Sequence, residues 1–116
     1  ILAKMDFVIV QSYAMTELAK SAHIVLPGLA PFEREGTITN DKGRIQWLRP
    51  SLATKGNSKP DWEILMLVSN ALQRESEHFT DLGEVIKKIS DQFSSYSDVS
   101  LFKIGTHGMA LNGKST

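Results

Sequence analysis

Two short runs of continuous apolar residues, separated by a short helical pattern, constrain the fold more than any other feature of the sequence. The first run, Phe7–Val10, lies in a predicted strand over residues 6–11, and the second lies in a predicted strand over residues 23–27. Continuous rather than alternating hydrophobicity is typical of parallel strands that are covered on both faces. The apolar residues between the runs have helical spacing, which predicts a short amphipathic helix. The sequence therefore predicts an α/β fold that begins with a small compact βαβ unit and a right-handed crossover.

Two strands alone make a poor sheet, and the chain begins with Ile1 rather than Met. We therefore expect a piece cut from a longer protein, in which further strands come from before residue 1 or from another chain. Without them, the strand edges are templates for pairing with other segments. We expect either self-association of the chain or docking of Val99–Ile104 as a third strand.

The middle of the chain predicts a β-hairpin over residues 37–47. One arm contains Thr37, Ile38 and Thr39, and the other contains Arg44–Trp47. The intervening Asn40–Gly43 segment suits a type I turn followed by Gly43 in the left-handed conformation. This hairpin accounts for part of a long stretch that has little helical signal.

Two amphipathic helices are predicted after the hairpin, over residues 60–73 and 81–93. Ser58 and Asp61 fit the capping-box pattern, and Pro60 suits the first turn. The apolar residues of the first helix cover a broad face, so we expect most of this helix to be buried. The second helix carries an apolar stripe at helical spacing, which consists of Leu82, Val85, Ile86, Ile89 and Phe93.

The sequence after residue 93 carries weaker signals. We divide the chain into a partial α/β domain over residues 1–93 and a weakly structured C-terminal segment over residues 94–116. Within that segment, residues 99–104 fit a strand or an extended docking segment. Residues 105–116 fit a loop or a disordered end.

Composition excludes several functions for these residues. The 13 basic residues match the 13 acidic ones, which argues against nucleic acid or an anionic membrane as the main partner. The absence of cysteine excludes disulfides and thiolate ligands for zinc or iron–sulfur clusters, and the 3 histidines lack metal-ligand spacing. No apolar run is long enough to span a bilayer. We expect a cytoplasmic chain with no catalytic residue and no metal site of its own.

A series of short motifs runs in a fixed order from residue 5 to about residue 73. The motifs are Gln11, Thr16-Glu17, Ala19-Lys20, Leu26-Pro27, Glu33-x-x-Gly36-Thr37, Thr39-Asn40, Arg44-x-Gln46 and Pro60-Asp61-Trp62. In this order and at this spacing, they resemble the late part of the molybdopterin oxidoreductase family. That family includes formate dehydrogenases, nitrate reductases and the large G subunit of NADH-quinone oxidoreductase, which is respiratory complex I.

Two positions depart from the family pattern. His23 stands where the family usually has Asp, and Gly43-Arg44 stands where many cofactor-carrying members have two arginines. Gly-Arg at this point is more similar to the G subunit. The resemblance implies that this subunit keeps the fold and in most members lacks the metal cofactor, so the departure puts a bound cofactor in doubt.

The resemblance also implies which residues bind a cofactor, if the parent protein binds a molybdopterin dinucleotide. They are Gln11, Thr16, Glu17, Asn40, Arg44 and Gln46. Gln11 follows a strand at its carboxyl end, where open α/β sheets bind ligands. Arg44 has a planar fork that suits phosphate or an ion pair with Glu33 or Glu35. Helix capping explains Thr16 and Glu17 equally well, and turn chemistry explains Asn40.

Three functions are compatible with these observations. The first is a scaffold part of the G subunit, which takes part in electron transfer from NADH to quinone, with iron–sulfur clusters held elsewhere in the parent. The second is part of the cofactor wall of a molybdenum enzyme such as a formate dehydrogenase, with molybdopterin guanine dinucleotide. The third is an independent small α/β interaction module. The Gly43-Arg44 dipeptide favours the first, whose partners would be the rest of the parent subunit and other subunits of a redox complex, at the cytoplasmic face of a membrane.

Overall fold

A computed structural model describes residues 4–75 and 77–111 of the protein. The described residues form two compact units, each built from two separate stretches of the sequence. Unit 1 draws on Ile1–Arg34 and Pro50–Glu77, and unit 2 draws on Glu35–Arg49 and His78–Thr116. The mixture of a parallel sheet, an antiparallel sheet and helices confirms the predicted α/β class. A domain boundary at residue 93 stays a prediction.

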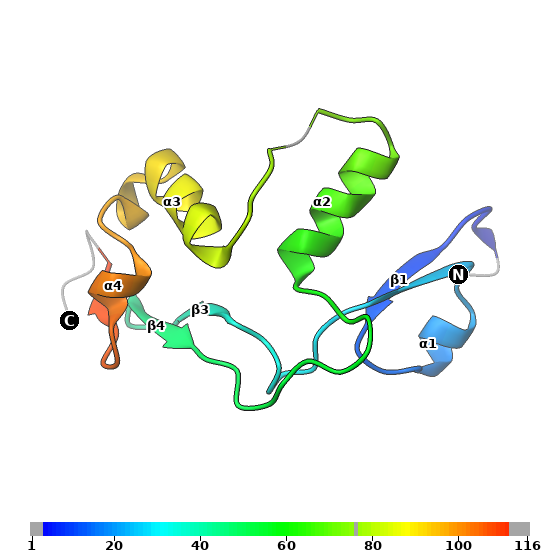
Figure 1. Cartoon of the computed structure of the whole chain (residues 1–116), viewed down its shortest axis with the longest axis horizontal. Coiled ribbons are helices and arrows are strands. Elements are labelled where there is room, and N and C mark those ends of the chain that lie inside the picture. Colours follow the sequence, from blue (N-terminus) through cyan, green and yellow to red (C-terminus); the bar gives the residue numbers. More distant parts are fainter. Residues whose placement is uncertain (1–3, 76, 112–116) are drawn as a thin grey trace. The chain divides into compact units, whose positions relative to one another are not determined.

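Unit 1 begins with the βαβ arrangement expected from the sequence (Figure 1). Strand β1 (Ile9–Ser12) pairs in parallel with β2 (Ile24–Pro27), in a register that places Ile9 beside Ile24. Helix α1 (Glu17–Lys20) connects them. The Thr16 hydroxyl caps α1 by accepting a hydrogen bond of 3.1 Å from the Ala19 N–H, so the chain turns into a helix directly after the loop that follows β1.

The expectation that both faces of these strands are covered is wrong for the described residues. Val8 is buried, but Phe7, Ile9 and Ile24 are 58%, 47% and 43% exposed. Side chains alternate between the faces of a strand. The face that contains Val8 is therefore covered within unit 1, and the face that contains Ile9 is partly open.

Helix α2 (Asp61–Ala71) completes unit 1 and differs from its prediction in two respects. Pro60 occupies the N-cap position and no side chain caps the helix, so the capping box with Ser58 is wrong. The helix is also far less buried than expected, because Ile64 is 4% exposed whereas Leu65 and Leu72 are 64% and 67% exposed. A sheet of two short strands offers too little surface to cover more than one line of helical side chains.

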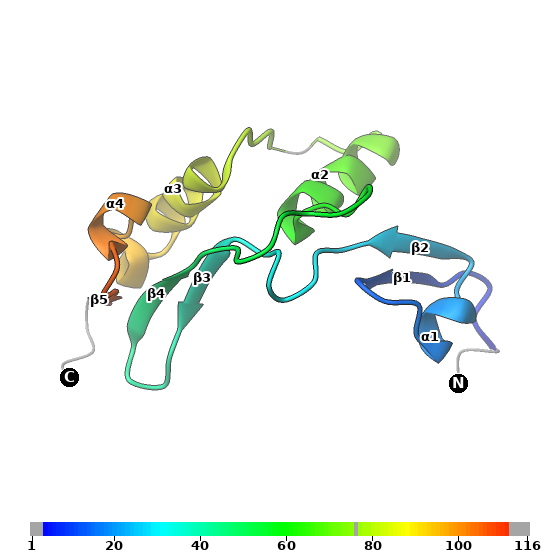
Figure 2. The ribbon, with the colours of Figure 1, turned by 60° about the horizontal axis from the view of Figure 1, so that its bottom comes forward.

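Unit 2 is built around the predicted hairpin (Figure 2). Strand β3 (Gly36–Thr39) pairs antiparallel with β4 (Arg44–Leu48), and β4 also pairs with β5 (Met109–Ala110). Gly43 has a φ of 74°, as predicted. Its N–H donates to the Asn40 carbonyl at 3.0 Å, which closes the turn. The hairpin prediction is therefore confirmed in its arms and in its turn.

The rest of unit 2 consists of helices that return to the hairpin. Helix α3 (Leu82–Gln92) begins where Asp81 accepts a hydrogen bond from the Glu84 N–H, and a 3-10 turn, η2 (Ser94–Tyr96), follows it. Helix α4 (Leu101–Ile104) is capped by Ser100, so the strand predicted over residues 99–104 is wrong. These residues join the core of unit 2 instead of extending β1 and β2. The buried core consists of Ile45, Ile86, Val99, Ile104 and Leu111.

Candidate functional site

Three of the residues predicted to bind a cofactor lie in the hairpin of unit 2. The Asn40 side-chain oxygen accepts hydrogen bonds from the Lys42 and Arg44 N–H groups at 3.1 and 2.9 Å. The Arg44 guanidinium donates from Nε and Nη2 to the His107 carbonyl at 3.0 and 2.8 Å, and Nη2 also donates to the Gly108 carbonyl at 3.2 Å. Arg44 therefore fastens the segment before β5 to β4, a structural task that the sequence did not reveal.

The two carboxylates proposed as ion-pair partners of Arg44 bind other groups. Glu35 accepts a hydrogen bond of 3.2 Å from the Trp47 indole, and Glu33 accepts one of 3.0 Å from the Ala30 N–H. Among the described residues, the Arg44 guanidinium is hydrogen-bonded to carbonyl oxygens and forms no ion pair with Glu33 or Glu35. Gln46 lies on the same face of β4 as Arg44, opposite Ile38 on β3, and its side chain is exposed.

The other three predicted residues lie in unit 1. Thr16 caps α1, and Glu17 forms an ion pair of 2.6 Å with Lys20. Both residues therefore stabilise α1 itself. Gln11 differs, because its side-chain amide reaches a residue 50 positions away in the sequence. The cofactor-binding role of all six residues stays a prediction.

The contact that Gln11 makes defines a polar cluster, which we call the Gln11–Arg34–Asp61 cluster. The Gln11 Nε2 donates to Asp61 Oδ1 at 2.5 Å, and Arg34 Nη1 lies 3.6 Å from Asp61 Oδ2. Arg34 is itself oriented by a hydrogen bond of 2.8 Å from its Nε to the Leu29 carbonyl. Asp61 therefore binds two side chains of unit 1 instead of forming a capping box with Ser58.

The backbone places this cluster at the carboxyl ends of both parallel strands. Gln11 lies near the end of β1, Asp61 is the first residue of α2, and Arg34 follows the loop that leaves β2. Gly28, directly after β2, forms a parallel bridge with Lys59, and this bridge brings the start of α2 to the sheet. The side chains of Arg34 and Asp61 are 41% and 50% exposed, so the cluster is open to solvent.

The chemistry of the cluster suits binding rather than covalent catalysis. A carboxylate accepts hydrogen bonds, a guanidinium donates to anions, and a primary amide does both. Sequence reasoning identified Gln11 from its place at the end of a strand, assigned Asp61 to helix capping and missed Arg34. The useful signal was Pro60: with Pro60 as the N-cap, Asp61 is the first helical residue rather than the third, which a capping box requires.

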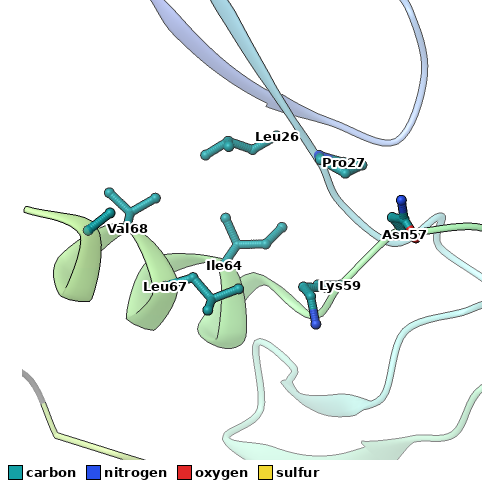
Figure 3. Close-up of a pocket in the computed structure, with 8 residues that line it drawn as sticks. Leu26, Pro27, Asn57, Lys59, Ile64, Leu67 and Val68 are labelled. Carbon is teal, nitrogen blue, oxygen red and sulfur yellow. The ribbon is translucent and has the colours of Figure 1, made fainter.

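An apolar hollow of about 370 Å³ lies between β2 and α2, also within unit 1 (Figure 3). Leu26 and Pro27 line it from the strand, facing Ile64 and Val68 on the helix. Asn57, Lys59, Leu67 and Ala71 complete its lining. Among the described residues that line the hollow, Lys59 is the one with a cationic side chain, and it is paired with Glu63.

The described residues contain no group of three His, Asp or Glu side chains that could hold a metal ion. In unit 2, the hydrogen bond that Lys87 donates to Asp91 and the negative charge of Asp91 raise the pKa of Lys87 on the exposed face of α3. Within residues 4–75 and 77–111, no helix has both the length and the apolar character that a membrane span requires.

Comparison with known proteins identifies the family. A model of the family described as molybdopterin oxidoreductase matches residues 1–71, which include all of β1, α1, β2 and α2. The chain belongs to the molybdopterin oxidoreductase family. The matched residues contain the Gln11–Arg34–Asp61 cluster and the hairpin, so both features belong to the part of the chain that the family shares.

Curated members of the molybdopterin oxidoreductase family narrow the comparison. The chain is 44% identical over 97 residues to a putative formate dehydrogenase of Staphylococcus aureus strain USA300. The aligned region covers 84% of this chain and 10% of that protein. It is 42% identical over 89 residues to a probable oxidoreductase of Bacillus subtilis, with 75% of this chain and 9% of that protein covered. It is 30% identical over 109 residues to subunit alpha of a formate dehydrogenase from Methanococcus maripaludis. Here the aligned region covers 93% of this chain and 16% of that protein.

These relatives favour the formate dehydrogenase interpretation over the G subunit interpretation. The Gly43-Arg44 dipeptide supported the G subunit, but both residues have structural roles in this chain. Gly43 supplies the positive φ of the turn, and Arg44 fastens the segment before β5. The chain spans between 9% and 16% of the length of these relatives.

Proposed function

We propose that this chain is part of a formate dehydrogenase of the molybdopterin oxidoreductase family, in which it supplies part of the protein wall around a molybdopterin dinucleotide. The observation that carries this proposal is the Gln11–Arg34–Asp61 cluster at the carboxyl ends of two parallel strands. Open α/β sheets bind ligands at this edge. The names of two of the three relatives support formate as the substrate of the complete enzyme.

The chemistry of the cluster fits a dinucleotide. The ring systems of such a cofactor carry N–H donors and carbonyl acceptors, and the Asp61 carboxylate and the Gln11 amide offer the matching groups. The Arg34 guanidinium is suited to a phosphate. When bound, the cofactor supplies the redox chemistry, and the residues of this chain bind it, orient it and limit the access of water.

The hairpin fits the cofactor less well than the cluster does. Asn40 is engaged by two backbone N–H groups of its own turn, and Arg44 uses Nε and Nη2 to hold two carbonyls. A role for Arg44 in anion binding would therefore rely on its Nη1. We assign the contact with the cofactor to the Gln11–Arg34–Asp61 cluster of unit 1, and a cofactor-binding role for Arg44 and Gln46 stays a prediction.

A substitution that removes charge but keeps shape tests this proposal in the complete enzyme. Asp61→Asn removes the carboxylate and should lower cofactor retention about 10- to 100-fold, the range expected for the loss of a hydrogen bond to a charged group. The measurements are molybdenum and pterin content together with the rate of formate oxidation. Asp91→Asn is the matched control, because Asp91 is an exposed ion-paired carboxylate on α3. Full cofactor content in the Asp61 variant would contradict the assigned contact, and a wild-type enzyme without pterin would contradict the proposed function.

A further inference from the structure

The loop that follows β2 contains a turn over residues 30–33. Its sequence is Ala-Pro-Phe-Glu, and Pro31 stands at the second position, where the fixed φ of proline favours a β-turn. The Glu33 N–H donates to the Ala30 carbonyl at 2.9 Å, and the Ala30 N–H donates to Glu33 Oε2 at 3.0 Å. Two hydrogen bonds thus close the turn, and one of them depends on the Glu33 side chain.

The backbone of this turn is anchored within unit 1. Leu29, directly before the turn, is 5% exposed. The Phe32 carbonyl accepts hydrogen bonds from the Ser51 and Leu52 N–H groups at 2.8 and 3.0 Å. Because both contacts hold the turn in place, the direction in which the chain leaves it at Arg34 depends on how the turn is closed.

Arg34 follows Glu33 directly and folds back across the turn. Its Nε donates to the Leu29 carbonyl at 2.8 Å, and its Nη1 lies 3.6 Å from Asp61 Oδ2. Within the described part of the chain, these contacts leave Nη2 able to donate to a ligand. The bond to Leu29 requires residues 29 and 34, at the two ends of the turn, to lie close together. A long side chain loses rotamer freedom when it is held in one place, so a turn that is already closed favours binding by preorganisation.

We propose that Glu33 is a positioning residue that acts through Arg34. Its carboxylate closes the turn as a hydrogen-bond acceptor, and the closed turn holds the Arg34 guanidinium at the edge of the sheet, so that Nη2 is available for a phosphate of the dinucleotide. The inference rests on the proposed function for the identity of this ligand. The link between Glu33 and Arg34 is a property of the chain itself.

Two variants of Glu33 separate the hydrogen bond from the charge. Glu33→Gln keeps an oxygen that accepts from the Ala30 N–H, and Glu33→Ala removes it. In the complete enzyme, Glu33→Ala should weaken cofactor retention about 3- to 10-fold, the range for the loss of one hydrogen bond. Retention is measured as the dilution at which half of the pterin is lost. Glu33→Gln should stay within about twofold of the wild type. Glu35→Ala is the matched control, because Glu35 bonds to the Trp47 indole in unit 2.

A double-mutant cycle with Arg34→Ala tests whether Glu33 acts through Arg34. In the Arg34→Ala enzyme, Glu33→Ala should weaken retention by less than about twofold further, because the side chain that it positions is already absent. Additive losses would assign to Glu33 an effect that is independent of Arg34 and would overturn the proposal. A loss in Glu33→Gln as large as that in Glu33→Ala would assign the effect to the charge and would also overturn it.

Exchange of the Arg34 Nε–H in the 116-residue chain is a readout that needs no cofactor. Glu33→Ala should raise this exchange rate at least about threefold, because a bonded N–H exchanges only when its bond opens, and Glu33→Gln should leave the rate nearly unchanged. Equal rates in the wild type and in Glu33→Ala would overturn the proposal even if retention fell. A wild-type enzyme without pterin, together with the expected exchange rates, would contradict the proposed function and support the positioning role of Glu33, so the two failures are distinguishable.

Discussion

Unit 1 and unit 2 both combine strands with helices but bury their apolar residues very differently. In unit 2, five buried side chains from the hairpin, α3, α4 and the residues around them form one continuous cluster. In unit 1, Leu29 and Ile64 are buried, whereas Phe7, Ile9 and Leu65 stand more than 45% exposed. The comparison shows that an apolar sequence is not sufficient for a core, because the partner surface must also be present.

The largest expected effect is a difference in stability between two alanine variants, one with a substitution in each unit. Ile104→Ala removes a side chain that is 1% exposed and should destabilise unit 2 by about 2–5 kcal/mol. Leu65→Ala, at a position that is 64% exposed in unit 1, should change stability by no more than about 0.5 kcal/mol. The two tryptophans serve as reporters in chemical denaturation, because Trp47 lies in unit 2 and Trp62 lies in unit 1. Equal effects of the two substitutions would contradict the contrast in burial.

The sequence predicted the elements of both units better than their burial. The βαβ order, the hairpin with Gly43 in the left-handed conformation and the start of α3 at Asp81 follow from local patterns of hydrophobicity and turn chemistry. Burial depends on what lies opposite each element, which a local pattern does not contain. This is why the local pattern predicts a buried α2, and why it predicts a strand or an extended docking segment over Val99–Ile104 although Ser100 caps a helix there.

The candidate site was predictable in the same partial way. Gln11 could be singled out because ligands bind at the carboxyl ends of parallel strands. Arg34 and Asp61 reach that edge only through the fold of the loop after β2 and the bridge between Gly28 and Lys59. No local spacing links residues 11, 34 and 61, so their meeting required the structure.

A smaller effect is expected where unit 2 packs backbone against backbone. Gly108 has a φ of 73°, and a Cβ built there would lie 2.5 Å from the Ile45 carbonyl oxygen. Gly108→Ala should therefore destabilise unit 2 by about 1–3 kcal/mol, the range for a strained backbone position. Gly36→Ala is the control, because no atom lies within 4 Å of its Cβ position. Similar unfolding midpoints for the two variants, followed by Trp47 fluorescence, would show that β5 does not approach β4 this closely.

The smallest effect concerns the turn conformation alone. Gly43→Ala should cost about 1 kcal/mol because alanine disfavours the positive φ of this residue. Gly43→Asn should cost less, since asparagine tolerates the left-handed conformation better than alanine does. In unit 1, Gly56 has a φ of 65° and no atom within 4 Å of its Cβ position. Gly56→Ala should therefore lower the stability of unit 1 by a similar amount, measured by the fluorescence of Trp62 during unfolding. An alanine variant at Gly43 as stable as the wild type would refute the turn assignment.

The two-part sequence of unit 2 has a consequence for the order in which the protein is made. Ile104 and Leu111, which pack around Ile45, are synthesised roughly sixty residues after it. All of α2 is translated in the interval, so the hairpin waits with its apolar face uncovered while another unit is completed. Closing such a long loop is slow relative to local pairing. A nascent chain halted before Ile104 would therefore be a better substrate for chaperones than the finished chain, and a ribosome pause after Leu111 would let unit 2 close before synthesis continues.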